Sequence, residues 1–219
     1  MSSGEWTGNK WLKGLVAPWG FKAPGTEVNA GFDTRDGMLI SQHAGYYAEL
    51  VRRGVVYNAS AAAITLPVTG ATPTSLFSVY NPAGSNVTLE MIEVNVGLVN
   101  ATTVVDLVGV YYNTPAQTAA AIAANAPTDS SGNIVNALLG AGSGQAKFYT
   151  SFVLTTPTLA RIIGGWGATT HTMPNTVSKE FMGTLIVPPG VSIHLLMTTA
   201  ASHGSSTTLD ATWAEIPLS

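Results

Sequence analysis

The stretch TSLFSVYNPAGSNVTLEMIEVNVGLV, residues 74–99, carries the clearest structural pattern in the chain. It predicts a strand, a turn at residues 81–84 and a long second strand, because Asn, Pro and Gly favour a tight reversal between two β-rich runs. In the second strand the apolar residues lie on one parity up to Met91 and on the other from Ile92 onward. An apolar face changes parity only where an extra residue is inserted. The sequence therefore predicts a β-bulge near Met91 and Ile92.

Strand patterns continue on both sides of this stretch. Residues 102–112 are apolar on both parities, which predicts a strand covered on both faces. After a tight reversal at residues 188–190, residues 191–199 predict a strand with one better-buried face and with His194 on the other. Further strands are predicted from residue 55 onward and at 146–156, 179–187 and 207–218. With about eight strands and no alternation with helices, we expect an all-β fold, an antiparallel β-sandwich or jelly roll.

The residues before the first strand divide into an arm and a helix. Glycine and proline occur so often in residues 1–40 that no helical or strand period is sustained, which predicts an extended arm. Residues 41–54 predict a short helix that Ser41 caps and Gly54 ends. We therefore expect an arm over residues 1–40 and a single domain over residues 41–219.

An excursion interrupts the strands at about residues 114–145. Thr114, followed by proline and then by Gln117, forms a capping-box pattern that predicts a helix as far as Ala126. The polar, Gly-rich remainder predicts a loop with one helical patch at residues 133–139. A loop this long in a compact domain is usually functional or part of an interface.

The composition argues against several classes of function. Charged residues make up 10% of the chain, the formal net charge is −3 and there is no cysteine. The few cations are scattered, whereas phosphate neutralisation needs clustered positive charge, so we expect no nucleic-acid partner. The first residues lack the basic and apolar regions of a secretory signal, and no apolar run is long enough to span a membrane. We therefore expect no membrane partner.

The sequence contains no strong motif for catalysis or metal binding. The common zinc, phosphate-loop and acyl-transfer motifs are missing, and the Gly-rich residues 140–144 do not match a phosphate loop. The histidines have no ligand-like spacing, although His171 would suit a metal site shared between subunits. Glu90 and Glu93 lie on opposite faces of their strand unless a bulge intervenes, whereas a glycosidase needs two converging carboxylates. We expect no enzyme activity, no catalytic residue, no metal and no cofactor.

Several stretches together resemble a known group of proteins. They are RRGVVYNAS (52–60), YNPAGSNVTLEMIEVNV (80–96), GTLIVPPGVSIHLLMTTAA (183–201) and TWAEIP (212–217). With their Asn-Pro-x-Gly-Ser and Pro-Pro-Gly turns, they resemble phage-encoded virion proteins with a jelly-roll domain of the tumour-necrosis-factor type. The resemblance implies a trimeric structural part of a phage particle, such as a capsid decoration (cement) protein or a head or tail appendage. It carries over no catalytic residue.

Aromatic residues of the arm are the candidate partner-binding site. They are Trp6, Trp11, Trp19 and Phe21. Tryptophan is enriched at interface hot spots, and no local period buries these rings, so they pack either on their own domain or on another protein surface. We expect the second, with sister subunits of a homotrimer and the major capsid protein or another virion protein as partners. The expected location is the capsid surface, after synthesis in the host cytoplasm.

Two alternative functions stay open. A receptor- or glycan-binding module of a head or tail fibre would use exposed aromatic, Asn and Asp residues, around Tyr111 and Tyr112 or in residues 127–145. A jelly-roll capsid protein that encloses a genome is favoured less, because the arm lacks the dense Arg and Lys that packaged nucleic acid requires.

Overall fold

The computed structural model describes residues 31–33, 38–40, 46–64, 73–100, 104–169, 175–198 and 206–218. The chain divides into two compact units, residues 1–53 with residue 219, and residues 54–218. The first unit contains β1 (Gly31–Asp33), its antiparallel partner β2 (Met38–Ile40), and α2 (Tyr46–Arg52). The helix predicted over residues 41–54 is thus found at 46–52. Its predicted cap and most of the predicted arm lie outside the described residues.

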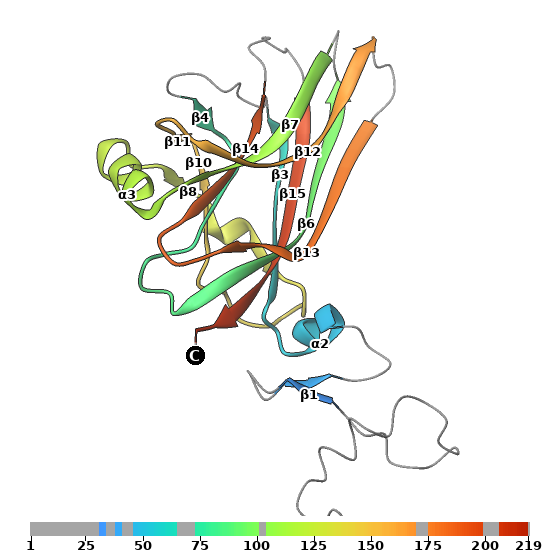
Figure 1. The fold of residues 1–219 in the computed structure, drawn as a ribbon, viewed down its shortest axis with the longest axis vertical. Coiled ribbons are helices and arrows are strands. Elements are labelled where there is room, and N and C mark those ends of the chain that lie inside the picture. The colour runs from blue at the N-terminus through green and yellow to red at the C-terminus, as the bar shows by residue number, and fades with distance from the viewer. Residues whose placement is uncertain are drawn as a thin grey trace, which may run out of the picture. The chain divides into compact units, whose positions relative to one another are not determined.

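The second unit is an antiparallel β-sandwich of two layers (Figure 1). The five-stranded sheet, in the order β13-β6-β15-β3-β9, contains β3 (Val56–Ile64), β6 (Val87–Asn100), β9 (Ile134–Asn136), β13 (Asn175–Val187) and β15 (Ser206–Pro217). The six-stranded sheet, in the order β12-β7-β14-β5-β10-β8, contains β5 (Ser78–Tyr80), β7 (Val104–Asn113), β8 (Thr128–Asp129), β10 (Lys147–Thr150), β12 (Thr158–Thr169) and β14 (Ser192–Met197). A separate pair is formed by β4 (Thr74–Ser75) and β11 (Phe152–Val153).

The connectivity of the main strands is that of a jelly roll. Taken in chain order, β3, β5, β6, β7, β12, β13, β14 and β15 form the rows β13-β6-β15-β3 and β12-β7-β14-β5. Such a double-sheet arrangement of antiparallel strands is the jelly-roll architecture. The predicted all-β fold is confirmed.

β6 contains the predicted β-bulge. Glu93 pairs with Thr212 of β15 and Met91 pairs with Trp213, so Ile92 is the extra residue. The buried apolar residues of β6 lie on one parity before Ile92 and on the other after it. Because of this insertion, one long strand keeps its apolar side chains on the core side along its length.

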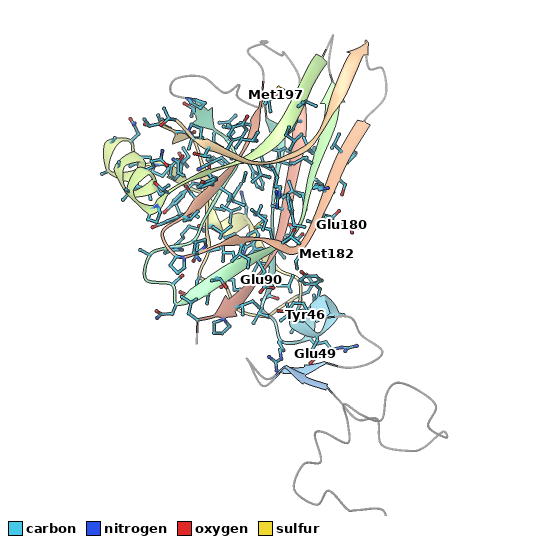
Figure 2. All side chains as sticks on the ribbon, in the orientation of Figure 1. Tyr46, Glu49, Glu90, Glu180, Met182 and Met197 are labelled. Carbon is cyan, nitrogen blue, oxygen red and sulfur yellow. The ribbon has the colours of Figure 1, made fainter. Side chains whose placement is uncertain are left out.

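The edge strand β13 bends opposite this bulge. Between Glu180 and Leu185, residues 181–184 face the single extra position of β6. Met182, labelled at the bend in Figure 2, has a φ of 47° and lies exposed. An interrupted edge is a poor template for pairing with a strand of another molecule.

The main core lies between the two sheets. Its fully buried side chains include Phe77, Leu89, Met91, Phe148, Leu209 and Trp213. A second, smaller core lies on the outer side of the six-stranded sheet and contains Tyr111, Ala121, Phe152, Leu154 and Leu196. Together with the main core it covers both faces of β7 from Val108 to Tyr111, whereas Leu107 is 44% exposed, so the predicted coverage of 102–112 on both faces is confirmed only for that part.

β12 lies where the sequence analysis predicted no strand. Its register against β7 shifts at Ala160, at Ile163 and again between Trp166 and Thr169, with one extra residue in β12 each time. Three bulges destroy the alternation on which strand prediction depends, and Gly164 and Gly165 weaken the apolar pattern further.

The excursion begins with the predicted helix, α3 (Pro115–Ala124). The Thr114 hydroxyl accepts a hydrogen bond from the Gln117 amide (3.4 Å), and the Gln117 side-chain oxygen accepts one from the Thr114 amide (2.9 Å). The capping box is confirmed, and the helix ends at Ala124 rather than at Ala126.

The predicted helical patch at residues 133–139 is wrong. After the short 3-10 helix η1 (Ser131–Asn133), β9 pairs with β3 at the edge of the five-stranded sheet. The β-branched residues Ile134 and Val135 favour an extended segment over a helix. The next residue, Asn136, holds this segment in place, because its side-chain amide donates to the Gly54 carbonyl (2.6 Å). β8 pairs with β10, which follows the excursion and pairs with β5, so the excursion adds an edge strand to each sheet, β9 to one and β8 to the other.

The prediction of one better-buried face for residues 191–199 is also wrong. All residues of β14 are buried. Its apolar row faces the main core, and its other row, which includes His194, is covered by the second core.

Replacing Gly190 with alanine is expected to lower the free energy of unfolding by about 1–2 kcal/mol. Gly190 has a φ of 87° in the predicted reversal, and a Cβ there would lie 3.0 Å from Pro115 Cβ. Gly84→Ala is the matched control, because nothing lies within 4 Å of its Cβ position and its φ is not positive. Urea unfolding of both variants checks this, and equal losses would contradict it.

Candidate interaction surfaces

The predicted partner-binding residues Trp6, Trp11, Trp19 and Phe21 lie outside the described residues, as does His171. The candidate sites in the described part of the chain are two polar clusters and two outer sheet faces.

The first polar cluster surrounds His194 and is buried. The Ser78 hydroxyl lies 2.8 Å from His194 Nδ1, and the Ser192 hydroxyl lies 2.9 Å from Nε2. Thr118 of α3 extends the chain of hydrogen bonds, with its hydroxyl 2.9 Å from that of Ser192. β5, β14 and α3 thus each contribute a hydroxyl to this His194 network.

Burial lowers the pKa of His194 from 6.5 to about 3. The ring is therefore neutral at ordinary pH, with one nitrogen donating and the other accepting. The serines beside it are fully buried, and no carboxylate takes part in the hydrogen bonds given for the ring. The network ties α3 to the six-stranded sheet and does not present a nucleophile to a substrate.

The second polar cluster is formed by the Gly-rich loop and Glu215. The amides of Gln145 and Ala146 both donate to the Glu215 carboxylate, at distances of 2.7–2.9 Å. A Cβ on Gly144 would overlap that carboxylate, so glycine is required for the close approach. The amides at the end of this loop bind an anion of the protein itself, which is consistent with the interpretation of residues 140–144 as something other than a phosphate loop.

An apolar strip lies on the outer face of the six-stranded sheet. It consists of Leu107, Leu159 and Ile162, which are 44%, 42% and 48% exposed. Leu159 and Ile162 of β12 lie opposite Tyr111 and Gly109 of β7, and a Cβ on Gly109 would lie 2.7 Å from Leu159 Cδ1. The strip continues the second core outward beyond the part that α3 and β11 cover. Exposed apolar residues grouped in this way are typical of protein interfaces.

The candidate glycan site around Tyr111 is not supported. The Tyr111 side chain is buried in the second core, whereas glycan recognition by an aromatic ring needs an exposed face. Tyr112 is half-buried against the main core.

The outer face of the five-stranded sheet carries carboxylates beside a buried apolar part that contains Val56, Ala214 and Ile216. We call Glu90, Glu93, Glu180 and Asp210 the acidic face. Glu180 pairs directly with Glu93, and Glu93 pairs with Thr212, two residues from Asp210 on β15. Glu90 pairs with Ala214, two residues from Thr212 on the other side. Directly paired residues, and residues two apart on a strand, share a face, so these carboxylates point the same way.

The bulge decides where Glu90 and Glu93 lie. Without the extra Ile92 they would project from opposite faces, and with it they share one, which is the exception that the sequence analysis allowed for. The parity change was the available signal for the acidic face. No signal identified the apolar strip, because β12 was not predicted.

Within the described ranges, no three histidine or acidic side chains are placed to hold a metal ion. No helix in this part of the chain is long and apolar enough to cross a membrane. Comparisons with protein-family models, curated proteins and solved structures gave no match to the chain.

Proposed function

We propose that the chain is a structural protein of a phage particle, a capsid decoration protein that binds and stabilises the assembled shell. The aromatic arm makes contacts outside its own domain, and a trimeric jelly-roll body carries the arms. The protein has no catalytic function in this proposal.

The apolar strip is the observation that supports a binding role most directly. A charge-poor sandwich exposes three large apolar side chains on one outer face, while its buried histidine and its Gly-rich loop are both occupied by internal hydrogen bonds. Cyclic symmetry would cover the strip of each subunit with a sister subunit and close the assembly. The resemblance of residues 50–219 to phage virion proteins points to the same role.

Stabilisation of a shell follows from mass action. A protein that binds the assembled lattice in preference to separated subunits shifts the equilibrium toward the lattice. Three arms on one body act at a high effective concentration, which raises overall affinity by about 10²–10⁴-fold.

The purified chain is expected to co-sediment with capsids of the encoding phage prepared without it. Replacing Trp6, Trp11 and Trp19 together with alanine should weaken this binding at least about tenfold, because interface tryptophans contribute strongly. Leu139→Ala, at a loop residue that is 83% exposed, is the control and should bind as the unchanged chain does. Failure of the unchanged chain to bind capsids, or glycan binding in its place, would refute the proposal.

A further inference from the structure

The acidic face has the charge of a docking surface, with Glu180 exposed and Glu90, Glu93 and Asp210 half-buried. Residues 54–218 contain seven acidic and three basic residues, and four of those acids lie on this face. Glu93, Glu180 and Asp210 form no ion pair with any described residue. These carboxylates lie on β13, β6 and β15; Figure 2 labels Glu90 and Glu180 on two of these strands.

Hydrogen bonds hold two of these carboxylates in place on the sheet. The Ser178 hydroxyl donates to Glu93 Oε1 (2.7 Å), and the Asn58 side-chain amide donates to Asp210 Oδ2 (2.7 Å). Ile186, which is 53% exposed, pairs directly with Glu90 and adds an apolar side chain to the same face. The surface thus combines fixed negative charge with one apolar contact point.

A segment of opposite charge occurs in the same chain. Residues 1–25 contain Lys10, Lys13 and Lys22 against the single acid Glu5, a formal side-chain charge of +2. Trp11 and Trp19 lie between these lysines, and Trp6 precedes them. A cationic segment with apolar rings complements an acidic face that offers an exposed isoleucine.

The geometry and the charges lead to one occupant. We propose that the acidic face binds residues 1–25 of a neighbouring copy of the chain. This inference rests on the proposed function, in which the arm makes contacts outside its own domain, and it names the partner surface. Residues 1–25 are long enough to reach a neighbouring copy, because 25 extended residues span up to about 80–90 Å. The radius of gyration of a domain the size of residues 54–218 is only about 15 Å.

Cross-linking between isotopically distinct copies of the full chain tests the proposal. A photoreactive amino acid replaces Leu12, which leaves the tryptophans and lysines intact, in a mixture of ¹⁴N- and ¹⁵N-labelled chains. We expect cross-links that join light to heavy peptides and that fall on β6, β13 and β15. Their yield should fall when the salt concentration rises from about 0.05 M to about 0.5 M, because exposed charges are screened.

Neutralisation of the acidic face provides the specific readout. Glu93→Gln, Glu180→Gln and Asp210→Asn together should reduce the cross-link yield by about three- to hundredfold, which is the range for three exposed charge interactions. Glu180→Gln alone removes no hydrogen bond made by a described residue, so it keeps the test valid if the triple variant is unstable. Asp129→Asn, at a carboxylate 3.9 Å from Lys147 on the other sheet, is the control.

The outcomes separate this inference from the proposed function. Cross-links confined to single chains, or cross-links to other surfaces, overturn the docking site even if the chain binds capsids. Light-to-heavy cross-links to the acidic face without capsid binding support the docking site and refute decoration.

Discussion

Lowering the pH from about 7.5 to about 4.5 is expected to reduce the free energy of unfolding by about 2.5 kcal/mol through His194 alone. Burial lowers the pKa of this histidine from 6.5 to about 3 in the folded protein. Between these values the unfolded chain holds a proton on His194 and the folded protein does not. Protonation therefore favours unfolding; the loss begins as the pH falls below 6.5 and is complete below about 3.

Among the described residues, no carboxylate forms a hydrogen bond or an ion pair with the ring. The groups bonded to it are the hydroxyls of Ser78 and Ser192, and Phe152 packs against it with ring centroids 5.1 Å apart. A charged imidazole in these surroundings would lose its hydration without gaining an opposite charge, so the protonated ring is disfavoured in the folded protein.

Urea unfolding of the unchanged chain and of His194→Gln across this pH range measures the effect. Glutamine keeps a donor and an acceptor but does not titrate, so the variant should lack the His194 part of the pH dependence. If the variant is too unstable to measure, NMR of the ring in the unchanged protein should show a neutral imidazole down to about pH 4. An imidazole that protonates near pH 6.5 in the folded state would contradict the prediction.

Replacing Glu215 with alanine is expected to lower the free energy of unfolding by about 3 kcal/mol. The buried carboxylate accepts hydrogen bonds from the amides of Gln145 and Ala146, and hydrogen bonds to a charged group are worth about 1.5–3 kcal/mol each. Without it, two amides lose their acceptor and the Gly-rich loop is no longer tied to β15.

Chemical denaturation and amide hydrogen exchange check this prediction together. The Gln145 and Ala146 amides should exchange at least about tenfold faster in the variant. The exchange rates of the β7 amides should change only as far as the global stability of the protein changes. Gly144→Ala, which introduces a Cβ against the carboxylate, should reproduce the faster exchange. Unchanged exchange at Gln145 and Ala146 would show that Glu215 does not hold the loop.

Much of the fold could be predicted because local and global preferences agree. The parity change predicted a bulge near Met91 and Ile92, which the structure has at Ile92, and the Thr114 capping box predicted α3. In both cases neighbouring residues alone determine the geometry. The Pro-Pro-Gly reversal before β14 was predicted for the same reason, and Gly190 in it has a positive φ.

The rest depends on contacts between distant residues. β12 has three extra residues in its register, and only pairing with β7 makes it a strand. β9 is a strand because β3 offers an edge, and the polar row of β14 is buried because α3 and β11 cover it. His194 therefore lies in the interior, although its strand pattern placed it on the less buried face.

The candidate surfaces follow the same division. The acidic face could be anticipated from the bulge, whereas the apolar strip needs the position of β12, which the sequence pattern did not reveal. The aromatic residues of the arm remain a prediction from sequence.

A reconstruction of the phage particle by electron cryomicroscopy tests the central proposal most directly. We expect jelly-roll density for this chain in three-fold clusters on the outside of the capsid shell, with the density of residues 1–25 leaving its own body. Density for the chain in the shell wall itself, at a fibre tip, or nowhere in the particle would contradict a decoration role.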